Sequence, residues 1–393
     1  MNQRLKSALI HSALFIVTFI TTTMAGATWA FSKSVILADA EGAWFINPDY
    51  SWSDFALGLP YSITFLLILT VHEFGHYFTA VYYRVKTTLP YYIPLPPLPY
   101  FFGTLGALIR IKSRIHTNTQ NFDIGIAGPL AGFVIALVMM TYGFLTLPEP
   151  GYIFEIHPEY EEYGINYAET VYSKQYLAER GIPDMIIGDN LLFWIFETYV
   201  ADPARVPNHH ELSHFPILFA AFLSLVFTAL NLIPIGQLDG GHVLYGLVGA
   251  KRHGIIASVI FVAFLFYATL GMLPPGQSLD VMGFFTAPHM VGVAIMIGFY
   301  YFCLKGLRVS PINTLLIAVG IFTVQYVINW FYPHVTGYSG WLLFAIIIGR
   351  LMPVQHPRTD IEEPLSPARK ILGWIALIVF VLCWTPNPIN III

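Results

Sequence analysis

The sequence predicts an all-α polytopic membrane protein, with about eight or nine transmembrane helices and a short membrane-dipping β/proline segment. Its 393 residues are 56% hydrophobic and only 11% charged, and their mean hydropathy is +0.64. Soluble domains carry about 25% charged residues, so this composition is typical of a membrane protein. Cys303 and Cys383 are the only cysteines and lie in apolar runs, which excludes a disulfide framework and a thiolate metal site. No basic tract indicates nucleic-acid binding.

Apolar runs long enough to cross a membrane recur along the whole chain. They cover residues 8–30, 60–83, 123–146, 213–236, 254–273, 288–305, 311–331 and 370–386, and a shorter run covers 339–351. The first run ends in a small-residue pattern that a signal peptidase accepts, but it is longer than the apolar core of a signal peptide. We therefore expect a retained N-terminal transmembrane helix.

The distribution of basic residues predicts a cytoplasmic N-terminus. One side of the membrane then collects Arg84, Lys86, Arg110, Lys112, Arg114, Lys251, Arg252, Lys305, Arg308, Arg350, Arg358, Arg369 and Lys370. The acidic segment 148–212 lies outside, and its roughly 65 residues are marginal for an independent core. Within it, residues 188–200 form either a short helix on the membrane surface or part of a solvated loop. Without a serine- and arginine-rich transit peptide, we expect the bacterial inner (cytoplasmic) membrane.

Residues 89–116 are apolar but contain too many prolines for a straight spanning helix. Non-helical backbone survives at membrane depth only when it is buried in protein or lines a wet cavity. We predict an extended proline segment followed by a strand-like stretch, GTLGALIRI, that dips into the membrane from the cytoplasmic side. A polyproline ligand for SH3-type partners is the alternative, which the apolar flanks disfavour.

Two histidines and a glutamate interrupt the apolar run at 60–83. His72-Glu73-Phe74-Gly75-His76 has the form H-E-x-x-H, which places both imidazoles on one face of a helix, one turn apart. Both can then bind one Zn²⁺, and Glu73 can take a proton from a water that the metal activates. The alternative is a chance pair of histidines with a snorkelling glutamate, but unused ionisable groups are costly inside a membrane span.

Asp239 is the best candidate for the third protein ligand that a catalytic zinc needs, because it is the only acid in residues 228–247. Pro234 breaks a helix there, and nearby glycines let the backbone bend. Alternatively, Asp239 caps a cytoplasmic helix. Asn231 either donates a hydrogen bond to the oxyanion of an attacked carbonyl or binds a neighbouring helix. His242 either orients Asp239 or lies near the membrane interface.

Most remaining histidines fall in loops or near helix ends, where a solvated imidazole is the expectation. They are His11, His116, His157, His209, His210, His214, His253, His289, His334 and His356. In AGPLAG (127–132), Gly128 and Gly132 have the small-xxx-small spacing that permits tight helix packing. We expect that structural role, with Asp123 and Gly125 as cap and turn residues at the start of this helix.

Four motifs then carry a family resemblance: HEFGH, GTLGALI, FDIGIAGPLAG and NLIPIGQLDGGH, in this order. Together they resemble the site-2 protease family of intramembrane zinc metalloproteases. The segment HPRTDIEEPLSPARK is similar to a plant and bacterial branch of that family. The resemblance implies that His72, His76 and Asp239 bind one Zn²⁺ per chain, with Glu73 as catalytic base and Asn231 at the family's asparagine position.

The resemblance also implies that GTLGALI binds an unwound substrate by strand addition. The substrate-binding candidates are Gly103, Thr104, Leu105, Gly106 and Ala107. Many bacterial members carry a PDZ domain in the outer insertion. We expect none in 148–212, which is short and has no carboxylate-binding glycine loop.

The predicted organisation has a catalytic core in two halves. The expected divisions are an N-terminal helix and outer loop (1–58), the first half of the core (59–147), the outer insertion (148–212), the second half (213–252) and a C-terminal transmembrane bundle (253–393).

The predicted function is zinc-dependent cleavage of transmembrane proteins within the lipid bilayer. One rival is the class of multi-span prenyl-protein proteases, which also carry HExxH but need a downstream glutamate ligand that no comparable apolar segment supplies here. The other is a transporter or receptor that uses the His/Asp cluster for ions, although no inverted repeats are visible.

Overall fold

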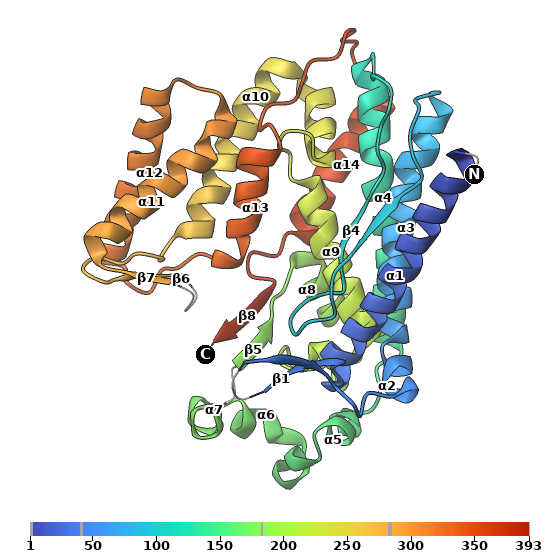
Figure 1. Ribbon diagram of the computed structural model, residues 1–393, viewed down its shortest axis with the longest axis vertical. Helices are drawn as coiled ribbons and strands as arrows, with labels where there is room; N and C mark the ends of the chain where they lie inside the picture. Colours follow the sequence, from blue (N-terminus) through green and yellow to red (C-terminus); the bar gives the residue numbers. More distant parts are fainter. Residues whose placement is uncertain (1–2, 40–41, 182–183, 282–284, 393) are drawn as a thin grey trace. The chain divides into compact units, whose positions relative to one another are not determined.

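The computed structural model describes residues 3–39, 42–181, 184–281 and 285–392 and is mostly helical (Figure 1). Five helices in this described part are long and apolar enough to cross a membrane. They are α1 (Gln3–Phe31), α4 (Asn118–Leu145), α10 (Asp239–Thr269), α11 (His289–Leu304) and α12 (Pro311–Phe331). The chain is therefore an integral membrane protein, as its composition predicts.

The other apolar runs also form helices. They are α3 (Leu59–Tyr82), α9 (Pro216–Leu232), α14 (Pro367–Cys383) and, for the shorter run, α13 (Leu342–Ile346) with the π-helical turn Ile347–Leu351. The remaining helices are short: α2 (Trp52–Leu57), α5 (Ile153–Ile156), α6 (Tyr167–Val171), α7 (Lys174–Arg180) and α8 (Leu191–Tyr199). The predicted break at Pro234 is confirmed, because α9 ends before it and α10 begins after it.

The chain divides into two compact units. The first unit consists of Met1–Arg114, Ala127–Leu230 and Ile378–Ile393, and the second consists of Ile115–Ile126 and Asn231–Leu377.

In the first unit, α1 crosses α3 at very close range. A methyl group on Gly58 would lie 1.8 Å from the carbonyl oxygen of Thr23, and one on Gly26 would lie 2.8 Å from the side chain of Tyr61. Thr22 and Ser62 exchange a hydrogen bond of 2.7 Å between the same helices. Glycine and small hydroxyl residues are what helices in a membrane use to approach one another, since apolar side chains gain nothing by leaving lipid.

A β-hairpin follows α3 in the first unit, where the sequence predicts a strand. Strands β3 (Tyr91–Pro94) and β4 (Thr104–Leu108) pair antiparallel, with Tyr92 opposite Ala107. The prolines between them have no N–H to donate, so the connection is an extended loop rather than a helix. The hairpin is held to α1, where Nδ1 of His11 lies 3.0 Å from the carbonyl oxygen of Pro90.

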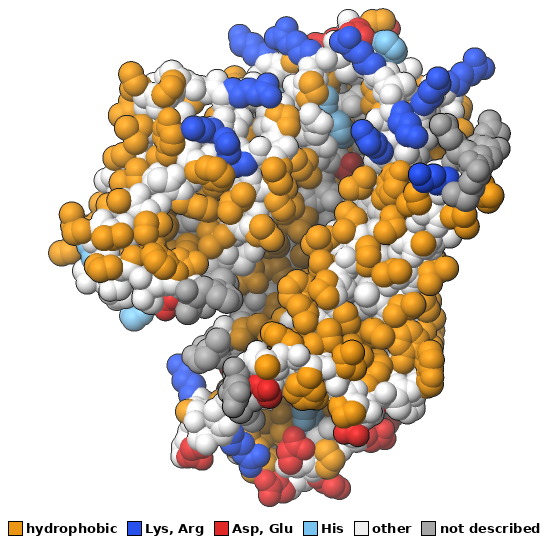
Figure 2. Space-filling view, in the orientation of Figure 1, with side chains coloured by type: hydrophobic (Ala, Val, Ile, Leu, Met, Phe, Trp, Pro, Cys, Tyr) orange, Lys and Arg blue, Asp and Glu red, His pale blue; other side chains and the backbone are white. Residues whose placement is uncertain are grey.

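The insertion 148–212 forms short helices and one strand. Strand β5 (Asp184–Ile187) pairs with β8 (Ile389–Ile392) near the C-terminus, so this strand has no partner nearby in the sequence to reveal it. Helix α8 confirms the helical alternative for residues 188–200. Figure 2 shows acidic side chains gathered over this insertion, at the lower end of the view, and apolar side chains over the outer face of α1. Two further strand pairs are β1 (Ile36–Ala38) with β2 (Trp44–Ile46) and β6 (Leu279–Val281) with β7 (Phe285–Ala287).

In the second unit, buried polar side chains bind the apolar helices to one another. Gln325 of α12 accepts a hydrogen bond of 2.5 Å from the hydroxyl of Tyr300 on α11 and donates one of 2.7 Å to the carbonyl oxygen of Phe266 on α10. A buried amide must satisfy both its oxygen and its nitrogen, so these contacts fix the relative rotation of the three helices.

The prediction for the start of α4 is wrong. Asp123 and Gly125 lie inside α4 and are not cap and turn residues. The Asp123 carboxylate forms an ion pair with Arg369 at 2.8 Å, and a methyl group on Gly125 would lie 2.5 Å from Cβ of His242. The helix starts earlier than the apolar pattern indicates because Asn118 exchanges hydrogen bonds with the backbone of Glu363.

The α1–α3 crossing predicts a specific sensitivity to added volume. Gly58→Ala should lower the free energy of unfolding by about 1–3 kcal/mol, the range for overpacking of a tight contact. Gly320→Ala is the matched control, because a methyl group there meets no atom within 4 Å. Thermal unfolding in detergent, followed by tryptophan fluorescence, measures both variants. Equal midpoints for the two would contradict a close crossing of these helices.

Candidate metal centre

Helix α3 carries the H-E-x-x-H motif and buries it. His72, Glu73 and His76 are 5%, 5% and 7% exposed, respectively. The Nε2 atoms of the two imidazoles lie 3.1 Å apart. Two nitrogen ligands of a tetrahedral Zn²⁺, each about 2.0–2.1 Å from the metal, lie roughly 3.3 Å from one another. The helix therefore holds both imidazoles close to the spacing that one metal ion requires.

Helix α4 packs against this motif through its glycines, all within the first unit. A methyl group on Gly128 would lie 2.1 Å from Nε2 of His76, and one on Gly132 would lie 3.0 Å from Cβ of His72. On the other side of the contact, a methyl group on Gly75 would lie 2.6 Å from the carbonyl oxygen of Ala127. The predicted tight packing of AGPLAG is confirmed, and its partners are the two histidines themselves.

In the second unit, a tight turn positions Asp239. The backbone turns at Gly236, whose φ of +57° favours glycine, and Asp239 is the first residue of α10. A methyl group on Gly240 would lie 1.9 Å from the carbonyl oxygen of Leu232. Asn231 lies in the last turn of α9, just before this bend. The sequence QLDGG thus contains glycines because the start of α10 folds back onto the end of α9. The helix dipole also favours a carboxylate in this first turn.

His242 belongs to a histidine cluster of the second unit. Its Nδ1 lies 2.8 Å from Nε2 of His356. Nδ1 of His356 lies 2.5 Å from the carbonyl oxygen of Pro357 and is therefore the protonated nitrogen, which leaves its Nε2 as acceptor. Asn121 donates to the same Nε2 at 3.0 Å. His242 accordingly carries its proton on Nδ1, so its Nε2 has a lone pair.

His356 is a residue that sequence reasoning missed. Its imidazole stacks on the ring of Tyr245 at 4.2 Å between centroids, and burial lowers its pKa. The loop position predicts a solvated side chain, because nothing in the sequence shows that residues 352–369 return to the start of α10.

The five substrate-binding candidates lie on the hairpin of the first unit. Thr104 is buried and its hydroxyl binds the carbonyl oxygen of Ile93 and the N–H of Gly106, at 2.8 and 2.9 Å. Gly103 and Gly106 have φ of +78° and +102°, which favour glycine at both ends of this short stretch. The side chain of Leu105 is 60% exposed. Ala107 pairs with Tyr92 of β3. The strand thus has two exposed side chains, Leu105 and Leu108, and its glycines bend it.

The comparison with known proteins agrees with this arrangement of motifs. The model of peptidase family M50 matches residues 60–274, more than half of the chain. The chain belongs to peptidase family M50. The match begins with α3 and includes both α4 and the turn at Asp239, so it covers all of the predicted site residues.

Plant proteins are among the relatives of this M50 chain. It is 28% identical to "Probable zinc metalloprotease EGY2, chloroplastic" of Arabidopsis thaliana over 194 residues, which are 49% of the chain and 29% of the relative. It is 29% identical to the corresponding EGY1 over 200 residues, or 51% and 31% of the two chains. For EGY2 of Oryza sativa subsp. indica the identity is 27% over 252 residues, or 60% and 41%. The chain thus spans less than half of the length of these relatives. No solved structure matches it.

The glycine contact on α4 predicts a requirement for small residues beside the motif. Gly128→Ala places a methyl group against the His76 ring and should weaken metal binding at the α3 motif at least several-fold, since a ligand moved by tenths of an ångström loses its geometry. Gly143→Ala on the same helix is the control, because its nearest neighbour would be an atom of Leu218 at 3.3 Å. Metal content by mass spectrometry measures both variants. Unchanged metal in Gly128→Ala would contradict the role of this contact.

Proposed function

We propose that this chain is an intramembrane zinc endopeptidase that hydrolyses peptide bonds of transmembrane proteins. The observation that carries the proposal is the buried pair of imidazoles on α3, with Nε2 atoms 3.1 Å apart and Glu73 beside them, in a chain of peptidase family M50. Burying three ionisable side chains in an apolar helix is costly unless they are used.

The donor set fits one Zn²⁺ per chain. His72 and His76 supply nitrogen ligands from α3, and Asp239 supplies a carboxylate oxygen from the start of α10. Two imidazoles and a carboxylate form a ligand set of catalytic zinc, with one position left for water or substrate. When bound, zinc supplies Lewis acidity both to the scissile carbonyl and to the attacking water.

Glu73 and Asn231 perform the remaining steps. Glu73 takes a proton from the attacking water and returns it to the nitrogen of the leaving amine, which is general base and then general acid catalysis. The side-chain amide of Asn231 donates to the oxyanion that develops on the attacked carbonyl, a contact typically worth about 3–4 kcal/mol in the transition state. A purely structural helix–helix hydrogen bond is the competing role for Asn231.

The substrate lies along β4 in this proposal. A transmembrane helix hides its carbonyl groups in its own hydrogen bonds, so it must unwind before it is cut. An unwound segment needs partners for its backbone, and the hairpin formed by β3 and β4 offers the edge of a two-stranded sheet at residues 103–107. The bend at Gly106 and the exposed side chain of Leu105 support this stretch as the contact surface.

The proposed location is supported by the charge distribution. Eight or nine spans with a cytoplasmic N-terminus place the basic loops inside and the acidic insertion 148–212 outside, in a bacterial inner (cytoplasmic) membrane. The hairpin then dips into the membrane on the cytoplasmic side, and the catalytic motif lies nearer that side. Membrane-embedded substrates and the surrounding bilayer are the partners that this placement requires.

The first prediction from this function concerns Glu73. Glu73→Gln is nearly isosteric and keeps both imidazoles, so zinc content should stay at the wild-type level. Cleavage of a model transmembrane substrate in proteoliposomes should fall by at least about 10²-fold, since the general base is lost. Cleavage at the wild-type rate would overturn the mechanism. A comparison of membrane-protein fragments in cells that express either form would identify natural substrates.

The second prediction concerns the third ligand. Asp239→Ala should remove the zinc ion held by the α3 motif and should abolish cleavage, whereas Asp280→Ala, at an exposed acid of the same unit, should leave both unchanged. Zinc per chain by mass spectrometry and substrate cleavage are the two measurements. A protease that uses a downstream glutamate as its ligand would keep its zinc in Asp239→Ala. An ion transporter would not hold one tight zinc that this substitution removes.

A further inference from the structure

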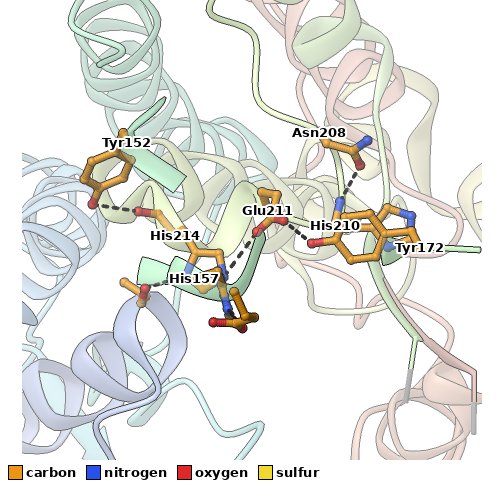
Figure 3. A network of polar contacts seen from close by, with 9 residues as sticks. Tyr152, His157, Tyr172, Asn208, His210, Glu211 and His214 are labelled. Atoms are coloured by element: carbon orange, nitrogen blue, oxygen red, sulfur yellow. Dashed lines mark hydrogen bonds and ion pairs between the residues drawn. The ribbon is translucent and has the colours of Figure 1, made fainter. Parts of the chain in front are cut away.

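A second cluster of metal-binding side chains lies in the insertion and in the turn that follows it, away from the motif on α3. It consists of His157, Glu211 and His214, all in the first unit (Figure 3). One ligand atom from each of these residues lies within 4.8 Å of the others. The Nε2 atoms of the two imidazoles are 3.2 Å apart, and Oε2 of Glu211 is 3.4 Å from Nε2 of His214.

Hydrogen bonds on the far side of each ring fix the tautomers. Nδ1 of His214 lies 2.5 Å from the carbonyl oxygen of Ala30, which can only accept, so this nitrogen carries the proton. Nδ1 of His157 lies 3.0 Å from a carboxylate oxygen of Glu159 and donates to it. In the neutral rings both Nε2 atoms therefore have lone pairs, and these lone pairs face each other. A carboxylate or a carbonyl behind the imidazole is the usual support of a metal-binding histidine.

Glu211 turns a third acceptor toward the same point. Its side chain is only 2% exposed, and its Oε1 accepts a hydrogen bond from the hydroxyl of Tyr172. Its Oε2 has no hydrogen-bond partner among the described residues. A buried carboxylate oxygen without a donor is costly unless a cation faces it.

We propose that His157, Glu211 and His214 form a second metal site, which binds a divalent transition metal of the Zn²⁺ type. The 3.2 Å spacing of the two Nε2 atoms fits tetrahedral ligands of one zinc ion, which lie roughly 3.3 Å apart. A cavity of about 390 Å³ adjoins the cluster and is lined by all three side chains and Tyr172, so a water molecule has room to take the fourth position.

The site connects parts of the first unit that are distant in sequence. His157 follows α5 near the start of the insertion, and His214 ends the turn before α9. Through the Ala30 carbonyl, the His214 ring also contacts the last turn of α1. A bound metal would therefore fasten the insertion to the ends of two helices, which a weakly packed segment of this size needs. A further acceptor cluster among the described residues of the insertion, Asp189, Glu197 and His209, is only partly buried and has a smaller burial cost.

A zinc count on the full-length protein in detergent tests the site without depending on protease activity. The apo protein is reloaded with excess Zn²⁺, passed over a desalting column and analysed for zinc per chain. The double variant His72→Gln/His76→Gln, which lacks the ligands on α3, should retain one zinc. Adding His157→Gln to it should bring the value to zero. His116→Gln, at a side chain that is 64% exposed, is the matched control and should change nothing.

Glu159→Gln provides a graded test, because it removes only the carboxylate behind His157. Zinc at the second site should then bind at least about 10-fold more weakly, with the stoichiometry restored at high zinc. A double variant that retains no zinc, or one that keeps its zinc when His157→Gln is added, would overturn the second site. Zinc lost from the wild-type count only through His157→Gln, with none lost through the double variant, would instead disprove the catalytic site and leave this one standing.

Discussion

The constraint on which the first unit depends is the burial of two imidazoles and a carboxylate in one turn of an apolar helix. Ionisable groups there are tolerated only when protein surrounds them and gives them partners. Helix α4 covers these groups closely because it has glycines at the contact. Gly128 lies against His76, and Gly132 lies against His72. A larger residue at either position would push the rings apart. The small-residue motif of α4 and the H-E-x-x-H motif of α3 therefore form one packing contact, although they lie far apart in the sequence.

The helices could be predicted because each is determined locally. The run at 311–331 coincides with α12, and Pro234 separates α9 from α10 as its missing N–H requires. The strand at 104–108 was also predictable, because prolines exclude a helix and glycines mark the bend. For the same reason the motif on α3 was visible: a four-residue spacing is converted into an Nε2–Nε2 distance of 3.1 Å by helix geometry alone.

What could not be predicted depends on contacts between distant segments. Strand β5 has its partner in β8, roughly two hundred residues later, so no alternating neighbour reveals it. Asp123 and Gly125 have the sequence pattern of a cap and a turn, but α4 begins before them because Asn118 binds the backbone of Glu363. The sequence predicts a solvated His356 side chain, because its stacking partner, Tyr245, lies more than a hundred residues earlier. In each case a contact with a distant segment, and not the local sequence pattern, determines the structure around the residue.

The two histidine pairs differ in whether local or distant contacts fix their spacing. The Nε2 atoms of His72 and His76 on α3 lie 3.1 Å apart, and those of His157 and His214 lie 3.2 Å apart. The first spacing is set by a helix, whereas the second depends on the anchoring of His157 by Glu159 and of His214 by the backbone of α1. A site of the second kind has no motif, because its ligands are aligned by groups that the sequence does not place. It is recognised instead by electrostatics: two buried acceptors and one half-buried acceptor that face one another repel, and a cation at their centre removes the repulsion.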